Sequence, residues 1–272
     1  GWWIERDNHT IITMPGPPNE MQLMWTNSIM PRLQQKLGTA IIVSKTLKVF
    51  GLSEAKVDEL VSSFLVSTNP TVGTYAKPDG IHLRITAKAC TTDEAQAFIT
   101  EKERSIRAIL GDSIWGTDSD NLEAIIGALL MAKGLTMASM ESSTGGLLAN
   151  CITNIPGSSR YFKGGVIAYT DSVNTFYGID EHLTSRYGMI STEVAAAMAL
   201  AVRQHLRTDI GIALTAVTGP SEIEGKPIGT ICIGIDNGQR TSTFTKNYPG
   251  NRPQVKQRAV ISALFELRRI LI

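Results

Sequence analysis

Two uninterrupted apolar runs in the second half of the chain limit its fold more than any other feature. They occupy 210–217 and 228–235, and each has the length of one strand. A strand that is apolar at successive positions buries both of its faces. Because predicted helices alternate with strands from Asn121 onward, we predict a sheet covered by helices on both sides. Residues 119–272 are therefore expected to form an α/β domain of three layers, α/β/α.

The elements expected in this domain follow from hydrophobic periodicity and from turn residues. Helices are predicted at 121–133, 144–154, 171–178, 191–207 and 252–271. Strands are predicted at 135–140, 162–169, 209–217, 228–235 and 239–246.

Residues 39–118 have the pattern of a separate, small α+β domain. The predicted order is strand, helix, strand, strand, helix, strand, which is typical of split β-α-β folds. Ser53 is the expected N-cap of the first helix, at 54–65, and Gly111 the expected end of the second, at 92–110. A possible edge strand follows at 113–115.

Residues 1–38 are expected to be a truncated segment of a further domain. Two short strands precede a proline-rich turn and a helix near 19–37, with Asn19 as the expected N-cap and Pro31 as a kink or break. Two strands and one helix bury too little apolar surface to fold alone. This segment is therefore expected either to pack on another part of the protein or to have lost the rest of its domain.

Composition excludes several function classes. The formal net charge is +1, which gives no indication of nucleic acid or an anionic membrane as a partner. The three cysteines, Cys90, Cys151 and Cys232, are far apart, which is typical of a reducing compartment and predicts a cytoplasmic location. No metal-ligand spacing and no apolar run of membrane-spanning length occurs. We therefore expect neither a metal nor another cofactor.

A hydroxyl-rich and glycine-rich turn, Glu141-Ser142-Ser143-Thr144-Gly145-Gly146, links a predicted buried strand to a predicted helix. Such a turn presents hydroxyl and backbone N–H groups at one rim of the sheet, which suits an anion or an attacked carbonyl. The alternative is structural. The hydroxyls of this turn would then cap the helix, and its glycines would allow close packing.

Four further loops share this character. In a covered α/β sheet, ligands bind where the loops at the strand ends converge. Ser142, Tyr169, Thr215 and Arg252 are therefore predicted to face one pocket. A core position for Tyr169 and a solvated position for Arg252 are the structural alternatives. The loops lie at 156–159, 168–171, 215–220 and 248–252.

The motifs of the second half resemble, in order, those of the carboxy-terminal domain of the competence/damage-inducible protein A (CinA) family. They lie at 141–146, 156–162, 164–169, 188–191, 218–220, 225–230 and 249–252. Residues 14–21 are similar to the end of the family's molybdopterin-binding-like domain, and 39–118 to its middle domain. The body of the first domain is absent, so any nucleotide-pyrophosphatase activity that the family places there is expected to be missing.

The resemblance implies a nicotinamide-nucleotide amidase, which converts nicotinamide mononucleotide and water into nicotinate mononucleotide and ammonia without a metal. It implies Ser142 as the nucleophile, with Tyr169 and Thr215 in the catalytic pocket and Arg252 near the ligand. A guanidinium at that position can bind a nucleotide phosphate through two hydrogen bonds. Self-association into a homo-oligomer is also expected. The further substrate-binding residues that it implies are Thr144, Gly145, Gly146, Thr215 and Gly219.

One departure from the family pattern bears on activity. Asn174 stands where the family has the lysine that deprotonates the serine, and an amide cannot accept a proton at neutral pH. Losing a placed base costs roughly a hundred- to ten-thousandfold in rate. Lys226 or Lys163 could replace it. The sequence thus leaves two functions open: a weakened amidase, or a catalytically inactive nucleotide-binding or scaffold protein.

Smaller departures occur at Ser143, Ala216 and Thr218, where the family usually has Cys, Gly and Ala.

Nucleic-acid binding by 39–118 is a third hypothesis, because RNA-binding modules also use the split β-α-β order. The segment has no Gly-x-x-Gly clamp and no aromatic stacking pair on one strand. Its basic residues are expected to form a solvated sheet face, so no nucleic-acid partner is predicted. These residues are Lys45, Lys48, Arg84 and Lys88.

Overall fold

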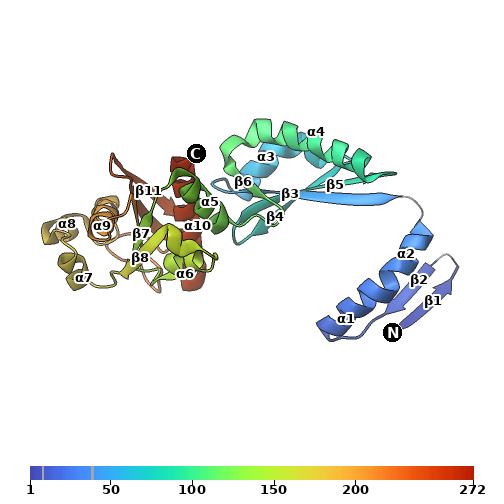
Figure 1. Ribbon diagram of the computed structural model, residues 1–272, viewed down its shortest axis with the longest axis horizontal. Helices are drawn as coiled ribbons and strands as arrows, with labels where there is room; N and C mark the ends of the chain where they lie inside the picture. The colour runs from blue at the N-terminus through green and yellow to red at the C-terminus, as the bar shows by residue number, and fades with distance from the viewer. Residues whose placement is uncertain (8, 38–39) are drawn as a thin grey trace.

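The computed structural model describes residues 1–7, 9–37 and 40–272. Three parts follow one another along its longest axis (Figure 1). A five-stranded sheet with helices ends the chain, a four-stranded sheet lies in the middle, and a two-stranded hairpin with a helix begins it. No helix within the described residues has the length and apolar character that crossing a bilayer requires.

The carboxy-terminal part is built on a mixed sheet in the order β11-β10-β9-β7-β8. Strand β7 is parallel to β8 and β9, whereas β10 is antiparallel to β9 and β11. Every strand lies within two residues of its predicted range. The strands are β7 (Met137–Glu141), β8 (Phe162–Ile167), β9 (Ile210–Ala216), β10 (Thr230–Asp236) and β11 (Thr241–Asn247).

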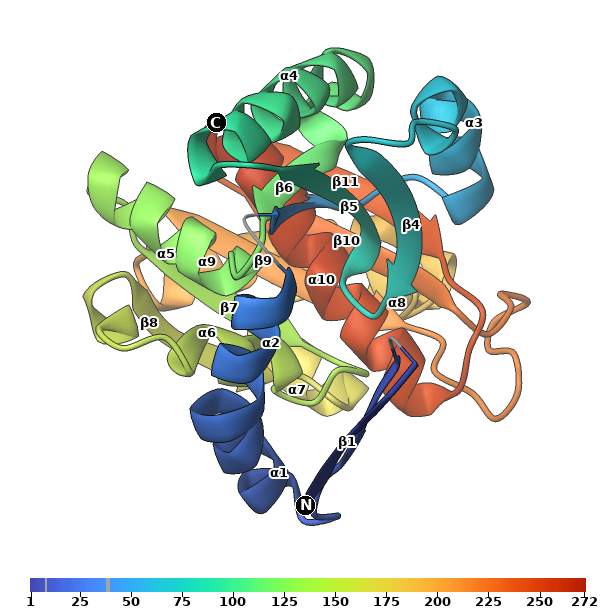
Figure 2. The same cartoon turned by 90° about the vertical axis from the view of Figure 1, so that its right-hand side faces the viewer.

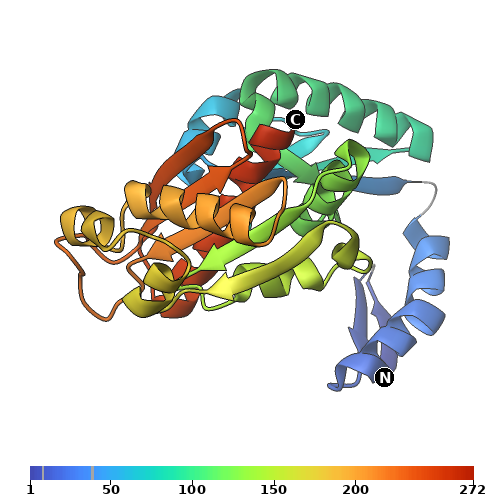
Figure 3. The same cartoon turned by 60° about the vertical axis from the view of Figure 1, so that its left-hand side comes forward.

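Helices cover both faces of this sheet. Residues of β9 show the division, because Ile212 and Leu214 join the core under α5 and α10 whereas Ala213 packs against α9. The orange helix α9 crosses one face in Figure 3. The three-layer α/β/α prediction is confirmed. The covering helices are α9 (Thr192–His205) on one face, and α5 (Leu122–Lys133), α6 (Leu147–Thr153) and α10 (Arg252–Leu271) on the other.

Two glycines set the distance between α9 and the sheet. A β-carbon added at Gly234 of β10 would overlap the carbonyl oxygen of Ala195, and one added at Gly211 of β9 would overlap that of Ala199. Only glycine lets the helix backbone and the sheet backbone approach this closely.

The helices around the sheet differ from the prediction in two places. Helix α6 begins at Leu147 and not at 144, and α8 (Glu181–Tyr187) was not predicted. Asp180 caps α8 by accepting a hydrogen bond from the His182 N–H at 2.9 Å. The seven residues of α8 are too few and too polar to show a helical apolar period. Helix α7 (Asp171–Phe176) lies within its predicted range.

The middle part is an antiparallel sheet in the order β4-β5-β3-β6. Helices α3 and α4 cover one face of this sheet and share its core. The α+β prediction is confirmed. In each of the two split β-α-β units, one other strand lies between the two strands that the helix connects. Ser53 caps α3 by accepting the Lys56 N–H, and Gly111 ends α4, as predicted. The elements are β3 (Ile41–Val49), α3 (Glu54–Leu65), β4 (Thr71–Lys77), β5 (Gly80–Ala89), α4 (Thr92–Leu110) and β6 (Ile114–Thr117).

The expected solvated basic face of this sheet is only partly present. Arg84 and Lys88 are exposed. Lys45 instead lies on the helix-covered side, because its Nζ meets Glu103 of α4 at 2.7 Å. Lys48 bonds to the Asp120 carbonyl oxygen at 2.8 Å. The prediction was wrong for these two lysines. Lys45 and Lys48 are three residues apart on β3, so strand alternation places their side chains on opposite faces of the sheet.

The amino-terminal part buries little. Strands β1 (Trp2–Arg6) and β2 (His9–Thr13) form a hairpin beside the helical run from Pro18 to Leu37. Within the described residues before 38, Ile29 alone is buried. The predicted N-cap at Asn19 was wrong, because the helix begins at Pro18, whose missing N–H suits a first helical position.

A π-helical turn (Trp25–Ile29) separates α1 (Pro18–Met24) from α2 (Met30–Leu37). The irregularity predicted for Pro31 therefore appears one turn earlier, since a proline ring disturbs the turn that precedes it.

The middle part is packed against α10. Phe50 and Phe265 pair with their ring centroids 5.2 Å apart, and Arg258 donates to the Lys77 carbonyl oxygen at 3.3 Å. Phe50 and Trp115 belong to the same buried cluster as the α10 side chains. Figure 2 shows α10 passing behind the strands of the middle sheet. Helix α10 therefore supports the carboxy-terminal sheet and the middle domain at once.

Candidate functional site

The predicted site residues follow strand ends that meet at one edge of the sheet. Because β7, β8 and β9 are parallel, Ser142 and Tyr169 follow the carboxyl ends of β7 and β8 on that edge, and Thr215 lies at the carboxyl end of β9. The antiparallel β10 begins there and β11 ends there, so α10 also begins there. The loop at 156–159 precedes β8 and lies at the opposite edge. The other four loops lie at the same edge of the sheet.

The turn after β7 is fixed against β9. The Ser142 N–H donates to the Leu214 carbonyl oxygen at 2.9 Å, and the Ser143 hydroxyl donates to that of Ala216 at 2.5 Å. Gly145 and Gly146 have φ of +62° and +91°, which only glycine adopts without strain. The loop after β7 therefore has one defined shape.

The alternative in which the hydroxyls of this turn cap α6 was wrong. The N-cap residue of α6 is Gly146, which has no side chain. The buried carboxylate of Glu141 caps the helix instead. Its two oxygens accept the N–H groups of Leu148 and Ala149, each at 2.9 Å. A negative charge is favourable there because helix N–H groups point at it. A nucleotide phosphate at the start of α6 would have to compete with this carboxylate.

Other donors of the turn stay unused. Within the described residues, the backbone N–H groups of Ser143, Thr144 and Gly146 make no hydrogen bond, and neither does the Ser142 hydroxyl. The Gly145 N–H donates to the Ser142 carbonyl oxygen at 3.0 Å. The turn thus places a free hydroxyl next to free N–H donors, which is the combination that attack on a carbonyl requires.

Thr215 and Asn174 meet at Met189, at the same edge. The Thr215 hydroxyl donates to the Met189 carbonyl oxygen at 3.0 Å, and Asn174 Nδ2 lies 3.5 Å from Met189 Sδ. Asn174 Nδ2 also lies 3.4 Å from the Thr170 carbonyl oxygen. Asn174 Oδ1 is buried and has no partner in the described part of the chain. The Asn174 side chain is therefore held by neighbours other than Ser142.

The structural alternatives considered for Tyr169 and Arg252 have different outcomes. Tyr169 is 61% exposed, so it is not a core aromatic. Arg252, the first residue of α10, is exposed, which agrees with a solvated position, and its Nη2 donates to the Gly219 carbonyl oxygen. Gly219, which the resemblance implied as a substrate-binding residue, supplies that acceptor.

Lys256 is a residue that the sequence analysis missed. A β-carbon added at Gly145 would lie 3.7 Å from Lys256 Nζ, so this ammonium sits beside the turn. It follows Arg252 by four residues on α10, a spacing that puts both side chains on one helix face. That spacing was visible in the sequence, but the contact with the turn depends on how α10 packs.

The two lysines considered as replacements for the family lysine are engaged elsewhere. Lys163 donates to the carbonyl oxygens of Ser159 and Arg160 at the opposite edge of the sheet, so that hypothesis was wrong. Lys226 donates to the Tyr187 carbonyl oxygen at 3.3 Å and lies 3.5 Å from a Glu224 carboxylate oxygen.

Glu224 is a second residue that the sequence analysis missed. Its carboxylate accepts the N–H groups of Met189 at 2.7 Å and Ile190 at 3.1 Å. It thereby fixes the loop whose Met189 contacts both Thr215 and Asn174. Nothing in the local sequence indicates this contact, because 35 residues separate the partners.

Comparison with known proteins decides the family. Residues 119–271 match the model of the CinA C-terminal domain, and residues 44–116 match that of the damage-inducible protein CinA KH domain. The chain belongs to the CinA family. The homology predicted from the motifs is thereby confirmed for both matched segments.

Relatives and solved structures agree with this assignment. A competence-damage inducible protein of Moorella thermoacetica is 42% identical over 274 residues, which cover 100% of this chain and 66% of the relative. One of Clostridium kluyveri is 39% identical over 275 residues, covering 100% and 67%. The chain thus spans about two thirds of the length of these relatives.

Two solved structures each match more than half of this chain. A CinA superfamily protein of Escherichia coli has 28% identity and a TM-score of 0.53, and the match covers 56% of this chain and 92% of that one. A competence or damage-inducible protein of Enterobacter asburiae has 25% identity and a TM-score of 0.54, covering 56% and 96%. The CinA fold is therefore shared by these proteins and this chain.

Proposed function

We propose that this CinA chain hydrolyses the carboxamide of nicotinamide mononucleotide to nicotinate mononucleotide and ammonia, at a reduced rate. The free Ser142 hydroxyl beside the unused N–H groups of Ser143, Thr144 and Gly146 is the main support for this proposal. The CinA membership supports the choice of substrate.

The proposed reaction has two steps. Ser142 Oγ attacks the carboxamide carbon, and the C–N bond breaks as ammonia leaves with the hydroxyl proton. A water molecule then cleaves the resulting ester, which returns a proton to Ser142 and releases the carboxylic acid. The free N–H groups stabilise the oxyanion in both steps. Arg252 and Lys256 are the proposed partners of the nucleotide phosphate.

Asn174 makes this enzyme slow. Its amide cannot accept the serine proton, so we expect a rate roughly a hundred- to ten-thousandfold below that of an enzyme with a placed base. Binding of the nucleotide does not require that base. The proposal therefore predicts ordinary binding together with weak turnover.

Titration calorimetry with nicotinamide mononucleotide tests the binding half of the proposal. Lys256→Met and Arg252→Ala are expected to weaken binding at least about tenfold each, the usual scale for losing a charged hydrogen-bond partner. Lys163→Met is the matched control, because its ammonium lies at the opposite edge. Equal affinities for Lys256→Met and Lys163→Met would contradict the assigned role of Lys256.

The second candidate is a catalytically inactive nucleotide-binding or scaffold protein. The buried Asn174, held by Thr170 and Met189, favours it because this side chain makes no hydrogen bond to Ser142 in the described part of the chain. Absence of heat with millimolar nicotinamide and nicotinate mononucleotides would support the scaffold function. Heat without ammonia release would support a binding protein.

A further inference from the structure

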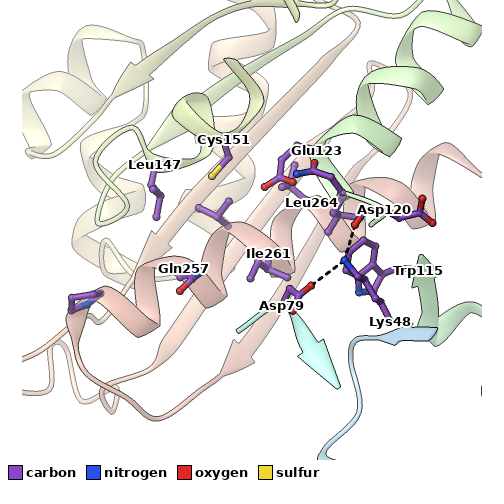
Figure 4. Close-up of a pocket in the computed structure, with 14 residues that line it drawn as sticks. Lys48, Asp79, Trp115, Asp120, Glu123, Leu147, Cys151, Gln257, Ile261 and Leu264 are labelled. Carbon is purple, nitrogen blue, oxygen red and sulfur yellow. Dashed lines mark hydrogen bonds and ion pairs between the residues drawn. The ribbon is translucent and has the colours of Figure 1, made fainter. Parts of the chain in front are cut away.

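The cavity between the middle domain and the carboxy-terminal helices offers few free polar groups to a ligand (Figure 4). Lys48 bonds to the Asp120 carbonyl oxygen at 2.8 Å and lies 3.8 Å from Asp79. The Cys151 thiol is hydrogen-bonded to Glu123. The open edge of the carboxy-terminal sheet at β8 offers more.

Strand β8 pairs on one side only, with β7, among the residues that the structure describes. The Ala168 N–H donates to the Glu141 carbonyl oxygen at 2.8 Å, toward β7. Because the backbone groups of successive strand residues point to alternate sides, those of Gly165 and Ile167 point away from the sheet. Lys163, the one charged residue of β8, is not free to oppose pairing, because its Nζ bonds to carbonyl oxygens of the preceding turn. Such an edge is a template on which another strand can pair.

Apolar side chains are exposed where β8 ends. Ile167 is 54% exposed, Tyr169 61% and Phe176 80%. The strand at the other edge of the sheet, β11, differs, because its exposed residues are threonines and an asparagine. Apolar groups gathered on a surface indicate a site of protein association. The β8 edge is therefore the candidate interface of this sheet.

The two ends of β8 carry opposite charges. Arg160 lies two residues before the strand, and Asp171 is the first residue of α7, which follows it. Both residues are exposed, and neither side chain has an ion pair in the described part of the chain. When two copies of β8 lie antiparallel, each Arg160 comes next to the Asp171 of the other copy. This charge complementarity favours a second copy of the chain as the occupant of the edge.

We propose that two copies of this chain pair through β8, antiparallel, about a two-fold axis at Gly165. The outward N–H and C=O groups of each Gly165 bond to those of its counterpart, and the two five-stranded sheets become one. Neither Gly164 nor Gly165 has a side chain that could hold the strands apart. Every contact of such a two-fold interface occurs twice, including the pair of Arg160 and Asp171.

This pairing also brings a further loop to the candidate site. The loop at 156–159 has the character of the site loops, but within one chain it lies at the opposite edge of the sheet. In the antiparallel pair, the amino end of one β8 lies beside the carboxyl end of the other. Ser159 and Arg160 of the second copy therefore lie next to Tyr169. The dimer thus joins the fifth loop to the four that one chain places at this edge.

Sedimentation equilibrium of the whole chain with charge reversals tests this proposal. We expect the wild type to form a dimer. Arg160→Glu and Asp171→Lys should each raise its dissociation constant at least about tenfold, because each reversal creates two like-charge pairs. The double variant restores opposite charges and should dimerise more tightly than either single variant. Arg240→Glu and Glu222→Lys are the matched controls, since both residues are exposed and lie outside the β8 edge.

Three results would overturn the proposal: a wild type that stays monomeric at every concentration, single reversals that behave like the controls, or a double variant that dissociates as readily as the single ones. If a reversal does not fold, Arg160→Ala and Asp171→Asn replace the reversals and should weaken pairing in the same direction. Sedimentation uses no nucleotide, and neither Arg160 nor Asp171 has a role in the proposed reaction. Its failure therefore leaves the amidase proposal untouched.

Discussion

At the scale of single residues, Glu141 links the fold to the proposed chemistry. It ends β7, its side chain is 1% exposed, and it caps α6 through two N–H groups. The next residue is Ser142, so the same contact that starts the helix also fixes the position of the proposed nucleophile. This glutamate lies in the proposed catalytic motif, and its role in the structure is to cap α6.

Replacing Glu141 by glutamine is expected to lower the free energy of unfolding by about 1–3 kcal/mol. An amide has one acceptor oxygen, so its NH₂ group would face one of the two helix N–H groups. Urea unfolding measures the loss, with the exposed Glu222→Gln as the control. A change in Glu141→Gln no larger than in the control would contradict the capping role.

The sequence predicted where some site residues lie but not all of the contacts that they make. The motif positions indicated that Ser142, Thr215 and Arg252 would gather at one edge, because ligand-binding loops of a covered α/β sheet lie outside the strand ends. The contact of Lys256 with the turn and that of Glu224 with Met189 depend on packing between distant segments. No local pattern contains that information.

At the scale of elements, helix α4 is joined to the middle sheet by a partly buried charge cluster. Glu103, whose side chain is 12% exposed, meets Lys45 at 2.7 Å and Arg107 at 2.8 Å. Burial opposes ionisation of this carboxyl, but the hydrogen bonds from Lys45 and Arg107 outweigh burial and hold its pKa below the usual value. The sequence predicted both elements correctly but not the ion pair between them.

This cluster predicts a pH dependence. A lowered folded-state pKa means that Glu103 stabilises the fold above the ordinary carboxyl range and that the contribution disappears as the pH falls through the folded value. Glu103→Gln is expected to cost about 1–3 kcal/mol at neutral pH and to match the wild type in strong acid. Urea unfolding at several pH values measures this difference. A constant difference down to pH of about 2 would rule out the ionised pair as its source.

At the scale of the whole molecule, α10 connects the candidate site to the middle domain. Its first residues carry Arg252 and Lys256, while Phe265 further along packs on Phe50. The order of predicted helices and strands distinguished the middle domain from the carboxy-terminal domain. It did not predict that they share a core, because apolar side chains at an interface have the same pattern as those inside a domain.

Phe50→Ala is expected to reduce the free energy of unfolding by about 3–5 kcal/mol, the usual cost of truncating a buried aromatic. Phe50 is 3% exposed, whereas Phe176 is 80% exposed, so Phe176→Ala is the matched control and should change stability by less than about 0.5 kcal/mol. Equal stabilities of the two variants would show that the middle domain does not depend on this contact.

Ammonia release from nicotinamide mononucleotide, compared between the wild type and Ser142→Ala, tests the central claim most directly. Among the residues that the structure describes, the Ser142 hydroxyl has no hydrogen-bond partner to lose, so the variant should fold as the wild type does. We predict slow release by the wild type and a rate at least about a hundredfold lower in the variant. Equal rates for the two proteins would contradict the claim that Ser142 is the nucleophile.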